Sequence, residues 1–439
     1  MPWGRDRSPL VGGEPAAVVL PRSTEEVAAV VRWARRAGVA LVPAGGRTGY
    51  SGGAVAADGQ VVVALERLNR LLAWHRDVPA LTVEAGMLTR QLQRAATEEG
   101  WFFPVDFAAC DRSQIGGNVA TNAGGIRVIR YGMTGDWVLG LTVVTGSGEV
   151  LRLGGSRRRG ALLKDNTGPP LETLFVGSEG AFGILTEVTV RLTRPPAARR
   201  WLAALAAESL EALLAMLATA RRLPACPLAF ECFDRVCHRL MAEHLGGPLL
   251  PENPPFLALV ELEAATDELR SAARDWLRES PPAVDGRWIE EPEAQVRAWR
   301  YRLGISDRLA AGHRVHKNDL SVPVGALSSL ESEVRRLAGE VDLPLAVFGH
   351  LGDGNLHINL LCPVAMDQEH FAALCQRFDE ESYRRVVKLG GSISAEHGIG
   401  RLKRKFAHLT ASPEERQVFR GLKRLFDPDG ILNPGVGPF

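Results

Sequence analysis

Two histidines on either side of a glycine turn have the spacing that points most directly to chemistry. The turn is Asp353-Gly354, which lies between alternating apolar residues. It predicts a two-residue β-hairpin turn, because Asp and Gly tolerate the positive φ angles that such turns need. This turn would place His350 opposite His357, and Asn359 would join them on the same face. Neighbouring imidazoles can bind a divalent metal ion, most often zinc. The alternative is a pair of hydrogen-bonded structural histidines.

A third metal ligand is available in the segment Ser394–Gly400. Glu396 could complete a site of two histidines and one carboxylate. His397, the next residue, would then be available as a general base. The pattern indicates a metal-assisted reaction in which a proton is removed from the substrate.

Glycine is concentrated in two segments of the first half of the chain. Residues 44–53 combine glycines with hydroxyl groups, and their amides could face the oxygens of a diphosphate with no Cβ in the way. This loop has neither the Walker sequence nor the Rossmann GxGxxG spacing, and a plain glycine-rich turn is the alternative. Residues 111–125 alternate glycine with Asn, Thr and Ser, and Ile115 and Val119 interleave as buried residues would. This second segment is typical of a backbone that wraps a nucleotide-like ligand.

Strands and helices must position these segments. A strand is predicted at 15–22, and a helix follows from Glu25 to about Arg36, capped by Ser23 and ended by Gly38. Further strands are predicted at 40–43, 60–65, 81–84, 139–145, 149–153 and 184–192, with a helix at 88–99.

A second domain is expected to begin after the proline pair that ends at Pro196. Beyond it, strands are predicted at 201–205 and 256–262 and a helix at 210–222. A helical run at 299–306 then leads to the segment 315–323.

Composition excludes several classes of function. The 439 residues allow two or three domains. The 52 basic and 51 acidic residues nearly cancel, so no overall field favours nucleic acid or an anionic membrane. The six cysteines form no CxxC pair and the chain shows no signal peptide, which favours a reducing, cytoplasmic location. No apolar run approaches the roughly 20 residues of a membrane span.

Five motifs occur in order along nearly the whole chain: PAGGRTGYSGG at 43–53, SQIGGNVATNAGG at 113–125, GSEGAFGILTEV at 177–188, GHLGDGNLHIN at 349–359 and SAEHGIG at 394–400. Together they resemble the FAD-binding flavoproteins of the vanillyl-alcohol-oxidase and p-cresol-methylhydroxylase type. The nearest branch is that of the D-2-hydroxyacid dehydrogenases, which includes D-2-hydroxyglutarate dehydrogenase, D-lactate dehydrogenase and the glycolate oxidase flavin subunit.

The resemblance implies an α+β fold with three parts. A two-subdomain FAD-binding domain would occupy 1–195, with subdomains at about 1–75 and 76–195. A cap domain built on an antiparallel sheet would occupy 196–405 and hold the substrate and metal site. A C-terminal segment, 406–439, would return to the FAD-binding domain.

The resemblance also implies roles for single residues. Arg302, Ser306 and Lys317 match positions that bind the substrate carboxylate and its surroundings, although spacing alone would leave Arg302 on a solvated helix face. Asn359 would position the substrate, and His397 would be the base. The metal ligands would be His350, His357 and Glu396. The cofactor-binding positions would be Pro43, Ala44, Gly45, Gly46, Arg47, Thr48, Gly49, Ser51, Gly52, Pro104, Asp106, Ser113, Gly116, Gly117, Asn118, Thr121, Asn122, Gly124, Gly125, Glu179, Gly183, Ile184 and Asn433.

The implied reaction is the oxidation of a D-2-hydroxyacid to a 2-oxoacid, with hydride transfer to N5 of non-covalently bound FAD. A divalent metal, most often zinc, would lower the pKa of the hydroxyl group. The electron acceptor would be a protein or a quinone, and the resemblance is compatible with a homodimer. The alternatives are an oxidase of the same fold that uses O₂, a zinc hydrolase, and a non-catalytic FAD-holding subunit that needs partners. The sequence leaves open the particular hydroxyacid, the acceptor, the metal and the oligomeric state.

Overall fold

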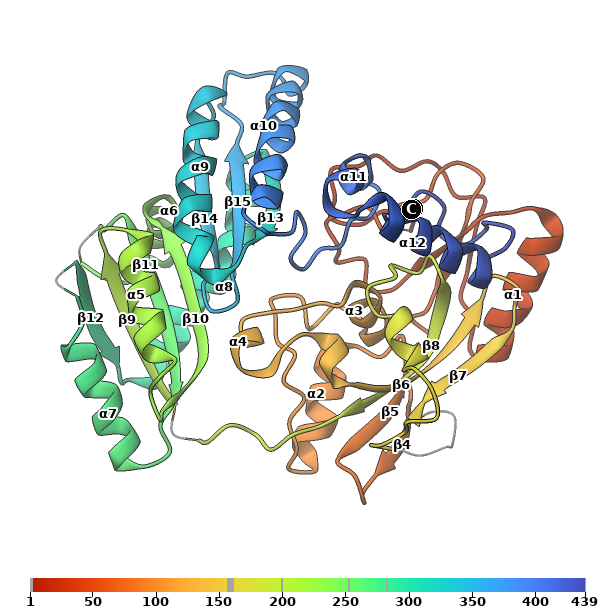
Figure 1. Ribbon diagram of the computed structural model, residues 1–439, viewed down its shortest axis with the longest axis horizontal. Coiled ribbons are helices and arrows are strands. Elements are labelled where there is room, and N and C mark those ends of the chain that lie inside the picture. Colours follow the sequence, from red (N-terminus) through yellow and green to blue (C-terminus); the bar gives the residue numbers. More distant parts are fainter. Residues whose placement is uncertain (1–2, 156–161, 199, 252, 282, 439) are drawn as a thin grey trace. The chain divides into compact units, whose positions relative to one another are not determined.

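A computed structural model describes residues 3–155, 162–198, 200–251, 253–281 and 283–438 (Figure 1). The chain forms two units, each built from more than one chain segment. The first unit takes the chain up to Gly125, the segment Gly132–Pro195 and the chain from Glu396 onward. The second unit takes Ile126–Tyr131 and Pro196–Ala395. The boundary between Pro195 and Pro196 falls inside the proline pair, and the chain returns to the first unit at Glu396.

Two sheets organise the first unit. A parallel sheet has the strand order β1-β3-β2, and an antiparallel sheet has the order β4-β5-β8-β6-β7. The strands are β1 (Ala17–Val19), β2 (Leu41–Ala44), β3 (Val61–Ala64), β4 (Leu71–His75), β5 (Ala80–Glu84), β6 (Val138–Thr145), β7 (Val150–Gly154) and β8 (Gly183–Arg191). The helices are α1 (Thr24–Ala37), α2 (Thr89–Glu98), α3 (Ile115–Thr121), α11 (Ala407–Thr410) and α12 (Pro413–Phe426), with short 3-10 turns at Thr134–Trp137, Leu171–Leu174 and Arg404–Phe406.

Local capping signals place α1 where the sequence predicts it. Ser23 Oγ accepts a hydrogen bond from Glu26 N at 3.2 Å, which satisfies a donor of the first turn. Gly38 ends the helix in the left-handed region, with a φ of 65°. The apolar face, which includes Val27 and Val31, is buried.

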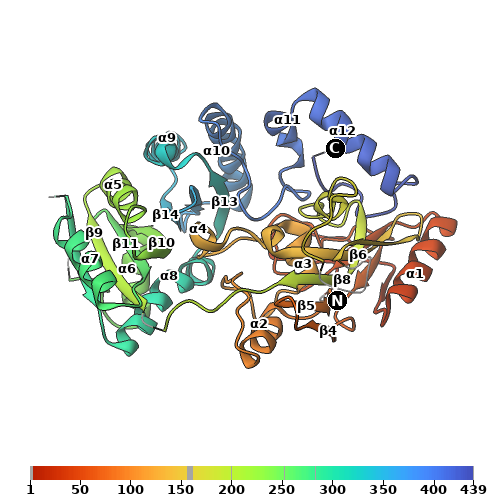
Figure 2. The same cartoon turned by 60° about the horizontal axis from the view of Figure 1, so that its bottom comes forward.

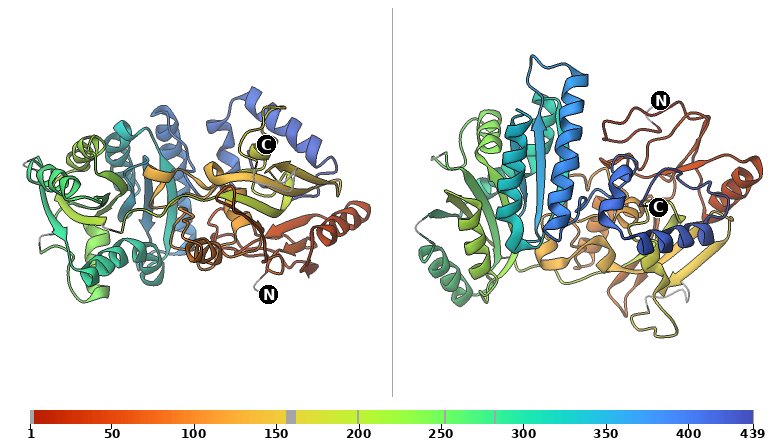
Figure 3. Two further views of the ribbon diagram at one scale, coloured as in Figure 1. Left: turned by 90° about the horizontal axis from the view of Figure 1, so that it is seen from below. Right: turned by 45° about the horizontal axis from the view of Figure 1, so that its top comes forward.

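The end of the chain returns to the parallel sheet of the first unit. Leu41 N on β2 donates to Ile431 O at 2.7 Å, and Asn433 N donates to Leu41 O at 2.7 Å. Lys423 of α12 donates through Nζ to Ala181 O at 2.8 Å, and the blue helix lies beside the yellow strands in both views of Figure 3. The tail therefore belongs to the same unit as the glycine-rich segments.

One antiparallel sheet of seven strands organises the second unit, in the order β12-β9-β11-β10-β14-β15-β13. The strands are β9 (Arg200–Ala207), β10 (Cys226–Asp234), β11 (Phe256–Glu263), β12 (Val284–Ile289), β13 (Val315–Ser321), β14 (Leu345–His350) and β15 (Asn355–Leu361). The helices are α4 (Val128–Tyr131), α5 (Leu210–Ala220), α6 (Arg235–Leu245), α7 (Asp267–Arg278), α8 (Pro292–Gly312), α9 (Leu327–Glu340) and α10 (Gln368–Lys388), with a 3-10 turn at Val324–Ala326.

Helices cover both faces of this sheet. α5, α9 and α10 lie on one side of the strands and α8 lies on the other (Figure 2). On the α8 side, buried side chains of α6 and α8 such as Met241, Tyr301 and Ile305 pack against Phe233 and Phe348 of the sheet. The architecture confirms the predicted α+β class with an antiparallel cap sheet. Within the described residues, no helix combines the length and the apolar character that crossing a membrane requires.

The hairpin that carries the two histidines differs from the prediction. His350 pairs with Asn355 and Phe348 pairs with His357, so residues 351–354 connect the strands. The predicted two-residue turn, with His350 facing His357, is therefore wrong. Because side chains alternate with a period of two, the histidines still share a face, and their ring centroids lie 5.3 Å apart.

Packing of the connecting residues explains the longer turn. Leu351 is fully buried, and Gly352 N donates to Phe230 O at 3.1 Å on the neighbouring strand. A Cβ at Gly352 would lie 2.6 Å from Ile129 Cδ1. These contacts with other parts of the unit outweigh the local preference of Asp-Gly for the shortest turn.

Candidate active site

Segments that the sequence assigns to a cofactor are joined by hydrogen bonds within the first unit. Asn433 Nδ2 donates to Gly53 O at 2.8 Å and to Glu179 O at 2.9 Å. Glu179 N donates in turn to Ala120 O at 2.7 Å. Three glycine-rich segments and the C-terminal tail therefore meet at one place.

Strained backbone marks the same segments. Five non-glycine residues in the described part of the chain have a clearly positive φ, and Arg47, Asn122, Glu179 and Asn433 are four of them, with φ values of 55°, 50°, 52° and 40°. Each such conformation costs on the order of 1–3 kcal/mol and persists only where surrounding contacts require it, often at ligand sites. The clustering supports a binding role for these loops.

Two buried acceptors in these segments fit a nucleotide cofactor. Gln114 Oε1 and Asn433 Oδ1 are buried, and neither has a hydrogen-bond partner among the described residues. A buried acceptor without a donor is costly, so a ligand N–H or O–H is expected beside each of them. Gln114 is absent from the predicted site residues, although it lies inside the motif at 113–125.

The segment 113–125, which the sequence predicts to wrap a nucleotide-like ligand, contains the helix α3. Gly116 N donates to Ala85 O at 2.8 Å, and a Cβ at Gly116 would lie 2.7 Å from Ala85 Cβ. The side chains of Ser113 and Asn118 bond to Thr89 Oγ1 at 2.8 and 2.6 Å. Part of the glycine and polar content of this motif therefore holds α3 against the strands.

Other predicted cofactor residues are built into the core. Gly183 and Ile184 open β8, and Ile184 is 1% exposed. Asp106 Oδ1 lies 4.0 Å from Cys110 Sγ, and Pro104 is buried. Cofactor contacts from these four residues stay a prediction.

Glu179 uses its side chain to hold the loop that follows His397. Its carboxylate accepts hydrogen bonds from Ile399 N at 2.9 Å and from Gly400 N at 2.9 Å. Burial raises the pKa of Glu179 to about 7, and the bonds from the Gly400 and Ile399 amides oppose that rise. Glu179 therefore connects the cofactor segments to the predicted catalytic loop.

The raised pKa of Glu179 predicts a pH-dependent stability. The folded state binds the proton of Glu179 more tightly than the unfolded chain does. The resulting contribution to the free energy of unfolding is therefore fully present below about pH 4.5 and is lost as the pH rises through about 7. The expected decrease in the free energy of unfolding is on the order of 3 kcal/mol. Thermal unfolding between pH 4.5 and 8 measures it. Glu179→Gln should have a flatter profile, and an unchanged slope in that variant would contradict the assignment.

Glu396 and His397 lie among the cofactor segments of the first unit. A Cβ at Gly124 would lie 2.9 Å from Glu396 Oε1, so the backbone at Gly124 comes close to that carboxylate. Ser51 Oγ donates to Gly398 O at 3.0 Å. The rings of Tyr50 and His397 stack at an angle, with centroids 5.0 Å apart. The predicted base is therefore held by the loops that the sequence assigns to the cofactor.

Cationic side chains gather on the α8 side of the sheet in the second unit. Lys317 on β13 donates through Nζ to Ser306 Oγ of α8 at 2.8 Å, and its strand partner is Asn359. Arg302 lies one helical turn before Ser306 and is 5% exposed. The structure thus brings together the predicted substrate-binding residues Arg302, Ser306, Lys317 and Asn359 within one unit, and Arg302 is not on a solvated face.

Arg302 keeps one donor without a partner. Its Nη2 lies 2.7 Å from Glu231 Oε2, and its guanidinium carbon lies 4.9 Å from the centre of the Phe348 ring. Its Nε is buried and has no hydrogen-bond acceptor among the described residues. A buried donor in this position fits an anionic ligand such as a carboxylate.

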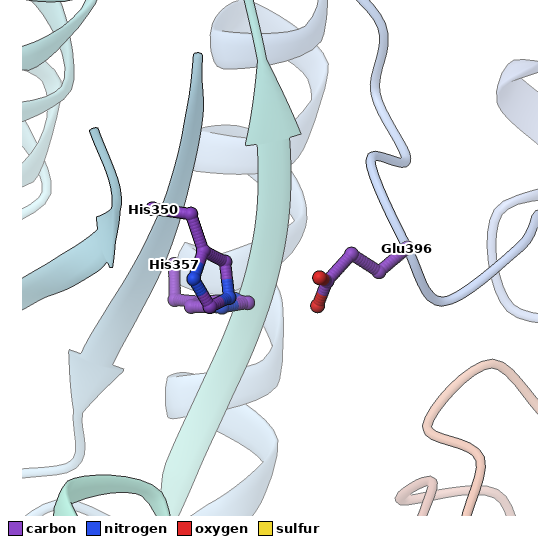
Figure 4. Close-up of side chains that lie close together, drawn as sticks. All are labelled: His350, His357 and Glu396. Carbon is purple, nitrogen blue, oxygen red and sulfur yellow. The ribbon is translucent and has the colours of Figure 1, made fainter. Parts of the chain in front are cut away.

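The side chains of the three predicted metal ligands lie close together (Figure 4). One ligand atom from each of His350, His357 and Glu396 lies within 4.8 Å of the others. Glu396 follows Ala395, whose N–H donates to Asp319 O on β13 at 3.4 Å. Two imidazoles and a carboxylate form a ligand set that suits zinc and other divalent transition metals.

Carboxylates that the sequence did not suggest surround the two histidines. Glu231 Oε1 lies 2.8 Å from His350 Nδ1, and Asp319 Oδ1 lies 3.6 Å from His357 Nδ1. Burial raises the pKa of Asp353 to about 6; His350 opposes the rise, and the charges of Glu231 and Asp319 add to it. In the sequence, Glu231 is distinguished only as a charged residue within an otherwise apolar segment.

Comparison with protein-family models matches both parts of the chain. Residues 15–154 match an FAD binding domain, and residues 196–436 match the C-terminal domain of the FAD linked oxidases. The chain belongs to the FAD-linked oxidase family. The FAD-linked oxidase assignment explains the paired units, and it confirms FAD as the cofactor and the predicted oxidoreductase class.

Curated relatives of this FAD-linked oxidase cover nearly its whole length. The D-2-hydroxyglutarate dehydrogenase of Xanthomonas citri pv. viticola is 43% identical, over 99% of this chain and 91% of that protein. The D-2-hydroxyglutarate dehydrogenase of Stutzerimonas stutzeri is 39% identical, over 99% of this chain and 93% of that protein. The mitochondrial D-2-hydroxyglutarate dehydrogenase of Bos taurus is 34% identical, over 97% of this chain and 77% of that protein. The resemblance found in the sequence is thereby confirmed.

Solved structures of more distant flavoproteins share the fold of this FAD-linked oxidase. p-Cresol methylhydroxylase with bound substrate superposes with a TM-score of 0.78 and 16% identity, over 100% of this chain and 92% of that one. The 4-ethylphenol oxidase of Gulosibacter chungangensis superposes with a TM-score of 0.75 and 20% identity, over 98% of this chain and 91% of that one. At these identities the likeness establishes the vanillyl-alcohol-oxidase type of fold and no more.

Proposed function

We propose that this FAD-linked oxidase oxidises a D-2-hydroxyacid to the 2-oxoacid, with D-2-hydroxyglutarate as the first candidate substrate. Relatives along the whole chain carry that activity in their names. The observation that carries the proposal is the buried Nε of Arg302, which has no acceptor among the described residues and belongs to a side chain 3.5 Å from His350. This arrangement suits an anionic hydroxyacid.

The residues of the second unit bind and orient the substrate. Arg302 offers a planar fork to the substrate carboxylate, and Lys317 adds a point charge held in place by Ser306. Asn359 is 1% exposed and is fixed by Nδ2 bonds to Ala346 O and His357 O at 3.3 and 3.2 Å, so its amide oxygen can orient the substrate. His397 removes the proton from the substrate hydroxyl.

FAD and a divalent metal supply the remaining chemistry: when bound, the flavin is the hydride acceptor at N5 and the metal polarises the hydroxyl group. His350, His357 and Glu396 would hold the metal, and zinc suits this ligand set best. FAD would be held non-covalently by the segments at 43–53 and 113–125 together with Asn433.

The physiological acceptor in this proposal is an electron-transfer protein or a quinone. An O₂-using oxidase of the same fold is the second candidate. A zinc hydrolase would have no use for the FAD-binding segments. A homodimer and a cytoplasmic location stay predictions.

A substrate panel with a dye acceptor tests the proposal. We expect purified protein to be yellow and to oxidise D-2-hydroxyglutarate with a kcat/KM at least ten times that for D-lactate or glycolate. Chelation of the metal should abolish turnover while the flavin absorbance stays. Stoichiometric peroxide without dye would favour the oxidase, and failure to bleach the flavin with any of the acids would overturn the proposal.

A further inference from the structure

A buried carboxylate on β10 lies between two of the proposed functional residues. Glu231 is 1% exposed, and its two oxygens have different partners. Oε1 lies 2.8 Å from His350 Nδ1, and Oε2 lies 2.7 Å from Arg302 Nη2. All three residues belong to the second unit, on β10, β14 and α8. One carboxylate therefore connects a proposed metal ligand with the arginine proposed to bind the substrate.

Stability of the sheet alone does not explain a charge at this position. Phe230, Cys232 and Phe233, the neighbours of Glu231 in the strand, are each 1% exposed. Replacing a buried ion pair by apolar residues of similar volume is often neutral or stabilising. A carboxylate retained here is better explained by what it does to His350 and Arg302.

We propose that Glu231 is a positioning residue that couples metal binding to substrate binding, an inference that rests on the proposed function. By accepting the Nδ1–H of His350, Glu231 selects the tautomer whose lone pair is on Nε2, where it can bind the metal. By pairing with Nη2 of Arg302, it fixes the guanidinium so that Nε remains for the substrate. Loss of the Glu231 charge must then weaken both sites.

Asp319 of β13 is a second carboxylate near the histidines. It lies 3.6 Å from His357 Nδ1, and its second described partner is Asn355 Nδ2 at 2.9 Å. Because Glu231 contacts both His350 and Arg302, a change in the position of His350 at the metal can be transmitted through Glu231 to Arg302.

Glu231→Gln tests the inference, because glutamine keeps the shape of the side chain but removes the charge that pairs with Arg302. Zinc affinity is measured on metal-free protein by competition with a chelating dye, and D-2-hydroxyglutarate supplies kcat and KM. We expect zinc binding to weaken roughly 10- to 100-fold and KM to rise at least fivefold. FAD content should stay that of the wild type.

Glu261→Gln is the matched control. Glu261 is 4% exposed on the adjacent strand β11 and pairs with Arg127 and Arg200 at 3.1 Å, away from the proposed site. Zinc affinity within threefold of wild type is expected for this control. Wild-type zinc affinity in Glu231→Gln, or an equal loss in Glu261→Gln, would overturn the inference.

A second variant and the wild-type protein complete the experiment. If Glu231→Gln yields no folded protein, Glu231→Asp replaces it under the same criteria, because a side chain one methylene shorter cannot reach both partners. Wild-type protein that binds no zinc and oxidises no hydroxyacid would overturn the proposed function itself. If the wild-type protein binds zinc and oxidises the hydroxyacid, and the Glu231 variant has the same zinc affinity and the same KM, only the positioning role is overturned.

Discussion

Replacing His397 by Ala is expected to slow flavin reduction by D-2-hydroxyglutarate roughly 10²- to 10⁴-fold, the range that general-base catalysis contributes. The physical reason is that the hydroxyl proton has no other assigned acceptor when hydride leaves the substrate carbon. The variant leaves Glu396, the neighbouring proposed metal ligand, unchanged, and it leaves the hydrogen bonds that Ile399 N and Gly400 N donate to Glu179. FAD and metal contents should therefore match those of the wild type.

Stopped-flow bleaching of the flavin under anaerobic conditions measures this effect. His408→Ala is a suitable control, because His408 is an exposed histidine of the same C-terminal segment, with Nδ1 bonded to Lys405 O at 2.9 Å. The control should bleach at the wild-type rate. Undiminished bleaching in His397→Ala would reject this residue as the base.

Replacing Arg302 by Met is the second change with a large expected effect, and it acts on both stability and binding. The variant leaves the Glu231 carboxylate buried without its 2.7 Å partner, which should lower the free energy of unfolding by about 3–5 kcal/mol. It also removes the proposed contact with the substrate carboxylate, which should lower kcat/KM roughly 10- to 100-fold. Denaturant titration and steady-state kinetics measure the two effects separately.

A double variant distinguishes the two roles of Arg302. Arg302→Met combined with Glu231→Gln contains no unpaired buried charge, so most of the lost stability should return. The loss in kcat/KM should persist, because the substrate still lacks its cationic partner. Recovery of activity together with stability would mean that Arg302 acts only as a structural ion pair.

The sequence by itself determined the family, the cofactor class and most of the candidate site. The motifs that contain His350, His357, Glu396 and His397 are local patterns of residue type and spacing. The shared face of the two histidines is an example. It depends on the alternation of side chains along a strand, so it persisted when the turn between them proved longer than predicted.

The tertiary structure alone decided the turn itself and the charges around the histidines. Residues 351–354 take their conformation from contacts with Phe230 and Ile129, which lie far away in the chain. Glu231 is 119 residues from His350 in sequence, and only the pairing of β10 with β14 brings them together. Strand order and burial are properties of the folded sheet, because they arise from packing between distant segments, and no local spacing in the sequence encodes them.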